Sequence, residues 1–166
     1  MSSKLETMTR WLSDQEQRAW RGLMDLHAEL WSAVARDLQA NSGLSQGDYA
    51  ILACLSEAPG RRQRVTELAQ TIRWERSRLS HQLSRMEKRG LVVRTECPED
   101  ARGAFAEITP DGLTVITAAA PEHVASVRRH LFDALTPEQV EALAEISAAV
   151  LDGLRQSSSA GMNGST

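Results

Sequence analysis

Apolar residues recur at steps of three and four positions from residue 14 to residue 40, which predicts a long amphipathic helix. Ser13 and Glu16 have the spacing of a capping box at its start. The stripe consists of Trp20, Leu23, His27, Leu30, Trp31, Val34 and Leu38. A helix of roughly 27 residues would be about 40 Å long. A chain of this size cannot bury such a helix alone, so we expect a partner subunit.

Three shorter helical patterns follow the turn at residues 41–43. One begins after Ser45, whose capping-box partner position is Asp48 rather than Glu or Gln, and ends near the Ala58-Pro59-Gly60 breaker. The next covers residues 65–72, and a turn through Arg73 and Trp74 leads to a helix over residues 75–89. Gly90 stands where helices commonly end in a left-handed residue. A short helix, a turn and a second helix predict a helix-turn-helix.

Beyond Gly90 the pattern changes from helical to strand-like. LVVRTEC and AFAEIT flank the polar CPEDARG, which predicts a β-hairpin with a long tip. Thr109 and Pro110 then begin another helix, which Pro121 is expected to kink or split. Thr136-Pro137-Glu138-Gln139 opens a last helix with a capping box. We therefore expect a mostly α fold with a small β-hairpin wing, in which helices from both termini form a second, dimerising layer around a winged helix-turn-helix.

These patterns predict the following organisation along the chain. The ranges are a flexible segment over 1–12, a helical dimerisation region over 13–44 and 110–155, a winged helix-turn-helix domain over 45–109, and a disordered Ser/Gly-rich tail over 156–166.

Charge divides the chain more sharply than its net value of −3 indicates. From Arg61 to Arg102 there are eleven Lys/Arg and six Asp/Glu, whereas the remainder has eight and sixteen. A basic middle between acidic flanks favours a polyanionic partner for the middle segment. The alternative is an ordinary solvated basic face.

Several classes of protein are disfavoured by the sequence. The two cysteines, Cys54 and Cys97, are far apart in sequence, so we expect no disulfide framework. Residues 1–11 lack the apolar h-region of a signal peptide, and no apolar run approaches the length that spans a membrane. We expect a cytoplasmic protein without contact to a membrane. No Gly-rich phosphate loop, H-E-x-x-H or G-x-S-x-G motif occurs, so we expect neither an enzyme nor a cofactor.

The helix predicted over 75–89 has two opposite faces on a helical wheel. Leu79, Leu83 and Met86 share a narrow arc that predicts the buried side. The opposite face has donors and no carboxylate along its middle: Ser77, His81, Ser84 and Lys88, flanked by Ser80 and Arg85. Such side chains donate hydrogen bonds to phosphates and to base-edge acceptors in the major groove of DNA.

The tip of the predicted wing adds a second candidate contact. Arg102 stands beside Gly103 on a thin loop, and a narrow minor groove attracts such an arginine. Asp100 is assigned to orienting an arginine, either Arg94 or Arg102, because a carboxylate does not favour phosphate.

TELAQ, RSRLSHQLSRMEKRGLVVR, PEDARG and ITPDG together make the chain resemble the MarR family of bacterial transcription regulators over roughly residues 14–155. The resemblance implies a homodimer whose two winged helices bind a palindromic operator. We therefore expect a homodimeric repressor of an inverted-repeat operator. It implies that Ser77, Arg78, Ser80 and His81 occupy base-facing positions and that Arg102 is the wing-tip arginine. Many members release DNA when a small aromatic, carboxylic or phenolic ligand binds between the two layers.

The candidate residues fall into two groups. The DNA-binding group is Arg73, Arg76, Ser77, Arg78, Ser80, His81, Ser84, Arg85, Lys88, Arg94 and Arg102, in which Arg85, Lys88 and Arg73 are expected at phosphates. The group for an aromatic effector pocket is Trp20, His27, Trp31, Tyr49 and Trp74, for which ordinary core packing is the alternative.

Other functions remain open as alternatives. The winged helix could be a protein-interaction module that has lost DNA binding, or a redox-responsive regulator that uses Cys97. His123 and His130 share a helix face but lack nearby Cys or clustered carboxylates, so they form a weak metal-ligand set.

Overall fold

The computed structural model describes residues 10–97 and 100–162, and the side chains of residues 97, 100–102 and 158–162 lie outside this description. Three side chains of the sequence predictions, those of Cys97, Asp100 and Arg102, are therefore outside the described residues. The helices are α1 (Asp14–Ser42), α2 (Gln46–Glu57), α3 (Val65–Thr71), α4 (Arg76–Lys88), α5 (Pro110–His130) and α6 (Pro137–Met162), with 3-10 turns at Pro59–Arg61 and Phe132–Ala134. The strands are β1 (Arg62–Arg64), β2 (Val92–Cys97) and β3 (Asp100–Ile108).

Side-chain caps begin the principal helices as the sequence predicts. Ser13 and Glu16 form a reciprocal capping box on α1, and Ser45 and Asp48 form one on α2. The backbone N–H of Thr136 donates to Gln139, and the N–H of Gln139 donates back to the Thr136 hydroxyl, which caps α6. The positive φ of 71° at Gly90 confirms the left-handed residue predicted after α4.

The core lies within the winged helix-turn-helix, between α2, α3, α4 and the sheet. The strand order is β1-β3-β2, and both pairings are antiparallel. The fully buried side chains of this core include Ile51, Leu52, Leu55, Leu68, Leu79, Leu83, Met86 and Val92. Helix α5 adds Ile116 and Ala119 to the same cluster. This packing holds α4 with one face in the core and the other turned outward.

One glycine fixes where α5 leaves the wing. A Cβ atom on Gly112 would lie 2.1 Å from the backbone oxygen of Leu91, so no larger residue fits without moving the backbone. The Thr109 hydroxyl caps this helix through the Gly112 N–H. The start of α5 is thereby held closely against the beginning of β2.

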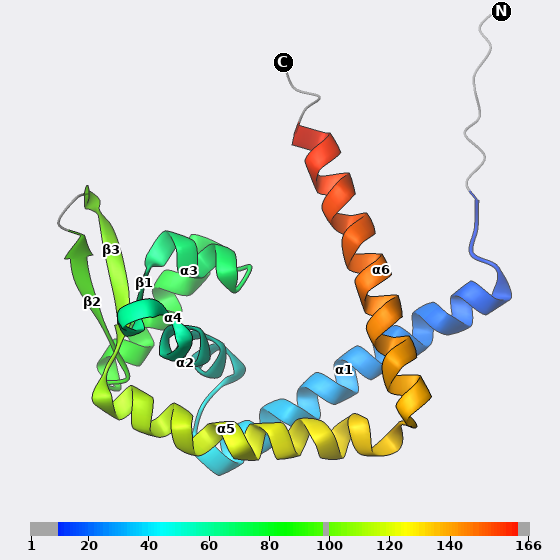
Figure 1. Ribbon diagram of the computed structural model, residues 1–166, viewed down its shortest axis with the longest axis horizontal. Helices are drawn as coiled ribbons and strands as arrows, with labels where there is room; N and C mark the ends of the chain where they lie inside the picture. Colours follow the sequence, from blue (N-terminus) through cyan, green and yellow to red (C-terminus); the bar gives the residue numbers. More distant parts are fainter. Residues whose placement is uncertain (1–9, 98–99, 163–166) are drawn as a thin grey trace, which may run out of the picture.

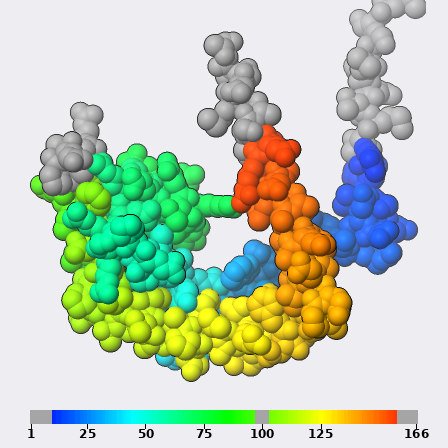
Figure 2. Space-filling model, viewed as in Figure 1, coloured from blue at the N-terminus to red at the C-terminus, as the bar shows by residue number. Residues whose placement is uncertain are grey.

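Helices α1 and α5 pack side by side, and α6 rises from the far end of α5, away from the winged unit (Figure 1). A space-filling view shows a wide hollow between α6 and the winged helix-turn-helix (Figure 2). Within the described residues, no helix is both apolar enough and long enough to cross a bilayer.

Three details differ from the sequence predictions. Strand β1 was not expected, because three residues are too few to show an alternating pattern and only their pairing with β3 defines the strand. Of the two outcomes expected at Pro121, a kink or a split, the split does not occur, because α5 is continuous from Pro110 to His130. Thr117, whose carbonyl loses its helical donor, is exposed, so water can satisfy that carbonyl. Helix α6 continues to Met162, past the predicted end at residue 155.

Candidate nucleic-acid interface

Helix α4 presents a donor-rich face to solvent. Leu79, Leu83 and Met86 are fully buried, as the helical wheel predicts. The exposed positions are Arg76, Ser77, Arg78, His81, Arg85 and Lys88, whereas Ser80 and Ser84 are half-buried. Serine, histidine, arginine and lysine side chains can all donate hydrogen bonds to phosphate oxygens or base edges.

The turn between α3 and α4 adds Arg73 to this side of the molecule. Arg73 has a positive φ of 55°, which is uncommon for a residue other than glycine. The N–H of Arg73 donates to the Gln70 carbonyl at 3.1 Å, and the N–H of Trp74 donates to the Ala69 carbonyl at 2.8 Å. These bonds hold the turn and leave the Arg73 side chain exposed.

Arg78 contacts the indole ring of Trp74. Its guanidinium carbon lies 4.0 Å from the ring centroid, a close cation–π arrangement. Trp74 is half-buried and packs against the core cluster, so it gives Arg78 a fixed support at the surface. Arg78 therefore belongs both to the exposed face of α4 and to the contact between α4 and the Trp74 ring.

A buried carboxylate that sequence reasoning missed positions α4. The Gln82 amide donates to Asp48 Oδ1 at 2.6 Å, and the Arg89 guanidinium donates to Asp48 Oδ2 at 2.7 Å. Burial favours the protonated form of Asp48. The Ser45 backbone N–H, Arg89, the Ser45 hydroxyl and Gln82 outweigh it and lower the pKa of the carboxyl. Arg85 donates to the Gln82 side-chain oxygen, so the network reaches the exposed face. Asp48 appeared in the sequence only as a capping residue.

Arg94, predicted to contact DNA, lies against α4. Its guanidinium donates to Glu87 at 2.6 Å and to the Ser84 hydroxyl at 2.7 Å. The hydrogen bonds from Arg94 lower the pKa of Glu87. This pair joins β2 to α4, and the carboxylate that orients Arg94 in the described structure is Glu87. Only the register of the wing brings the two side chains together, so no sequence signal could have found the pair.

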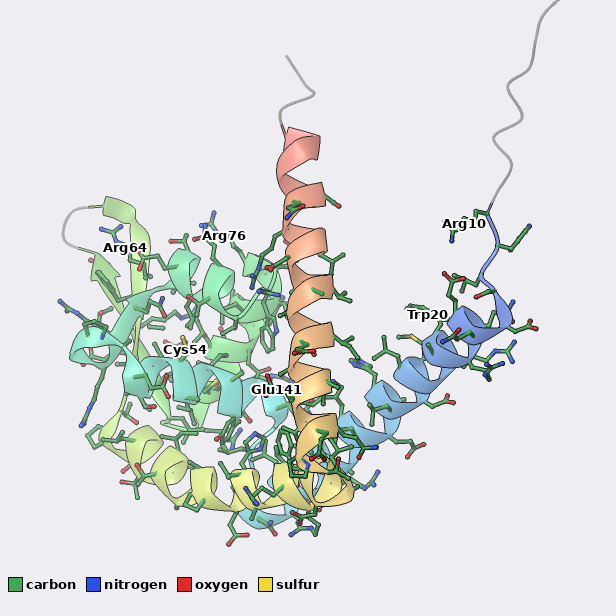
Figure 3. The ribbon with its side chains drawn as sticks, turned by 45° about the vertical axis from the view of Figure 1, so that its right-hand side comes forward. Arg10, Trp20, Cys54, Arg64, Arg76 and Glu141 are labelled. Carbon is green, nitrogen blue, oxygen red and sulfur yellow. The ribbon has the colours of Figure 1, made fainter. Side chains whose placement is uncertain are left out.

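Strand β1 brings two further arginines to the wing. The guanidinium groups of Arg62 and Arg64 lie 5.0 and 5.5 Å from the centre of the Phe105 ring on β3. Figure 3 shows Arg64 beside the wing and Arg76 on α4, both toward the side to which the wing points. The R-R-Q-R run at residues 61–64 was the signal in the sequence from which these arginines could have been found.

A cavity of about 590 Å³ between the two layers collects four of the five residues predicted for an effector pocket: His27, Trp31, Tyr49 and Trp74. Arg78 and His123 also line it. The indole N–H of Trp31 donates to His27 Nδ1 at 3.0 Å, which fixes both rings. Trp20 is 54% exposed on α1 and is not among the residues that line this cavity.

The remaining histidines and the described cysteine each contact a different partner. His130 contacts Asp37 at 2.9 Å, in a cluster with Ser126 and Arg129. His123 instead stacks on Tyr49, with ring centres 4.1 Å apart. Burial raises the pKa of Cys54, whose thiol lies 3.4 Å from the Gln63 side-chain oxygen. Over the described part of the chain, no group of three or more His, Cys, Asp or Glu side chains is arranged to hold a metal ion.

Comparisons with known proteins agree with this geometry. The model of the MarR family matches residues 44–103. The MarR family regulator Sco3205 of Streptomyces coelicolor, solved in complex with DNA, is 44% identical and has a TM-score of 0.83, over 88% of this chain and 92% of that one. The MarR family regulator AbsC of the same organism is also 44% identical with a TM-score of 0.83, over 89% and 99%. The transcriptional regulator HosA of Escherichia coli O111:H- is 31% identical over 101 residues, which are 61% of this chain and 69% of the relative.

Proposed function

Because the chain belongs to the MarR family of non-enzymatic, DNA-binding transcription regulators, we propose that it is a homodimeric cytoplasmic repressor that binds an inverted-repeat operator. The observation that carries the proposal is the exposed donor face of α4, whose opposite face is fixed in the core. Two such helices about one helical turn of DNA apart would enter successive major grooves of one operator.

The side chains divide by role on this proposal. Ser77 and His81 lie in the middle of the exposed face and read base edges. Arg73, Arg85 and Lys88 lie at its margins and bind phosphates, which fixes the register of the protein on the duplex. Arg102, whose side chain is outside the described residues, stays a prediction for the flanking minor groove.

Exposed apolar side chains on α1 and α6 support the homodimer. They include Trp11, Leu12, Trp20, Leu23, Met24, Leu26, Trp31, Ile146, Val150, Leu151 and Leu154, all on the segment before α1 or on the two long helices. Apolar patches of this extent mark interaction surfaces. A second copy that covered them would build the dimerisation region proposed for residues 13–44 and 110–155.

The interlayer cavity supports control by a small aromatic ligand. His27, Trp31, Tyr49 and Trp74 offer ring faces, and Arg78 is the one arginine or lysine among its lining residues. An aromatic carboxylate would pair with Arg78 while its ring packs against Trp74. Since Arg78 belongs to α4, a ligand that draws its guanidinium inward withdraws it from DNA.

Fluorescence anisotropy of the full-length protein against its own upstream intergenic DNA and a random duplex, at several salt concentrations, tests the proposal. We expect a steep salt dependence and a clear preference for the upstream DNA. Equal, weak binding to both duplexes would contradict it. An aromatic carboxylate should lower the affinity for the operator, and Arg78→Gln should remove that response.

A further inference from the structure

Gly47 on α2 lies against the indole ring of Trp74. A Cβ atom on Gly47 would lie 2.7 Å from Cη2 and 3.6 Å from Cζ2 of that ring. Gly47 is the second residue of α2 and does not have a positive φ, so its backbone conformation does not require glycine. Alanine is the better helix former at such a position. The structural reason for glycine here is therefore the space that the ring occupies.

The ring is the part of this region that an added side chain would move. The backbone of Trp74 is fixed, because its N–H donates to the Ala69 carbonyl at 2.8 Å. Helix α4 is held separately by the hydrogen bond from Gln82 to Asp48. A Cβ atom on Gly47 would lie 3.5 Å from Gln82 Cδ, which is an ordinary van der Waals contact. A methyl group at residue 47 would thus displace the indole ring and leave α4 in place.

Arg78 rests on the same ring, with its guanidinium carbon 4.0 Å from the ring centroid. Gly47, Trp74 and Arg78 line the interlayer cavity, and all three also line a neighbouring hollow of about 850 Å³. That hollow extends along α4 to His81, Arg85 and Lys88, the donors of the exposed face. A displacement of the indole ring would therefore reach the DNA-facing surface through the Arg78 side chain.

We propose that Trp74, held against Gly47, positions the Arg78 guanidinium for the edge of a guanine in the major groove. A guanidinium binds guanine O6 and N7 with two parallel hydrogen bonds, which requires one orientation of its plane. The flat face of the indole supports that plane, whereas a free arginine side chain would sample many orientations. Trp74 and Gly47 are positioning residues, since they act through Arg78. The inference rests on the proposed DNA binding and deepens it by naming residues that set base preference.

Operator binding by the full-length protein, measured by fluorescence anisotropy, tests the role of Gly47. We expect Gly47→Ala to bind about tenfold more weakly and to lose its preference for guanine at one position of each half-site. Arg78→Ala should lose the same preference, and the double mutant should be no weaker than Arg78→Ala. The thermal midpoint of Gly47→Ala should stay close to that of the wild type, because alanine favours the helix.

A second substitution should remove the effect of the first. Phenylalanine lacks the Cη2 and Cζ2 atoms that a methyl group at residue 47 would meet, yet it keeps an aromatic face for Arg78. In a Trp74→Phe background, Gly47→Ala should therefore cause no further loss of affinity and no further change in base preference. A tenfold loss that persists in this background would overturn the proposal, because the methyl group would then act by another route.

Fluorine NMR of the protein labelled with 5-fluorotryptophan, without DNA, observes the ring directly. The Trp74 resonance is the one that Trp74→Phe removes. It should shift in Gly47→Ala, because the ring moves, and in Arg78→Ala, because the cation leaves its face. An unchanged Trp74 resonance in Gly47→Ala would overturn the positioning role, whether or not DNA binds. Wild-type protein that shows no preference for its upstream DNA would instead overturn the proposed function, and with it the contact of Arg78 with guanine.

Discussion

The side-chain amide of Gln82 on α4 donates a 2.6 Å hydrogen bond to the carboxylate of Asp48, which is 2% exposed at the start of α2. The same carboxylate accepts the backbone N–H of Ser45, which begins α2, and a guanidinium N–H of Arg89 just beyond the end of α4. One buried group thus holds two helices in register, and this sets the angle at which α4 presents its outer face.

Asp48→Ala should lower the free energy of unfolding by about 2–3 kcal/mol. The change removes a helix cap and leaves the buried Gln82 amide without its acceptor. Arg89 adds little because its side chain is 44% exposed and water screens its charge. Urea denaturation measures the difference. Asp152→Ala is the matched control, since it breaks an exposed ion pair with Arg155, and it should change stability by less than about 0.5 kcal/mol.

Stability should fall in acid through the same carboxylate. The folded state lowers the pKa of Asp48, so its contribution is full above the unfolded value of about 3.9 and is lost as pH falls through the lower folded pKa. Thermal unfolding measured between pH 7 and pH 3 should show a decline that begins near pH 4. Asp48→Asn should be less stable at pH 7 and decline less steeply. Parallel curves for the two proteins would show that other carboxylates cause the acid loss.

His81→Ala should change which operator sequence is preferred, whereas Lys88→Ala should weaken all sequences alike. His81 is exposed in the middle of the α4 face and can bond one base edge, a contact worth about 1–3 kcal/mol of discrimination. Lys88 carries only charge to a phosphate, so its removal should reduce the salt slope by about 1. Competition binding against single-base operator variants separates the two. Identical profiles for both mutants would contradict this division.

Arg94→Ala and Glu87→Gln should weaken DNA binding by similar factors, and the double mutant should be no weaker than either. Arg94 connects β2 to α4 through its bonds to Glu87 and Ser84. Removing either Arg94 or the Glu87 carboxylate breaks the ion pair that holds the wing against α4. A double-mutant cycle on operator affinity should give a coupling energy of about 1 kcal/mol. Independent, additive effects would instead indicate that Arg94 leaves Glu87 and contacts phosphate directly.

Val150→Glu should convert the homodimer to a monomer. Val150 is 57% exposed on α6, in the apolar surface proposed for the partner subunit. A charge buried there without a partner costs several kcal/mol. Sedimentation velocity measures the mass. Val93→Glu is the control, because Val93 is 43% exposed on β2, outside both long helices, and the dimer should persist. A dimeric Val150→Glu protein would place the interface elsewhere.

Local patterns in the sequence determined most of the secondary structure and which face of α4 is buried. The caps at Ser13, Ser45 and Thr136 and the stop at Gly90 depend on neighbours a few residues away, so their spacing alone reveals them. The helical spacing of Leu79, Leu83 and Met86 among polar residues determined which face of α4 packs into the core.

Only the tertiary structure decided which distant side chains meet. Three contacts join different helices or strands: Asp48 with Gln82, Arg94 with Glu87, and Tyr49 with His123. Strand β1 likewise exists because β3 lies beside it. Periodicity reports one face of one element, whereas these pairs depend on how the elements dock, and docking minimises the free energy of the whole core rather than that of any local segment.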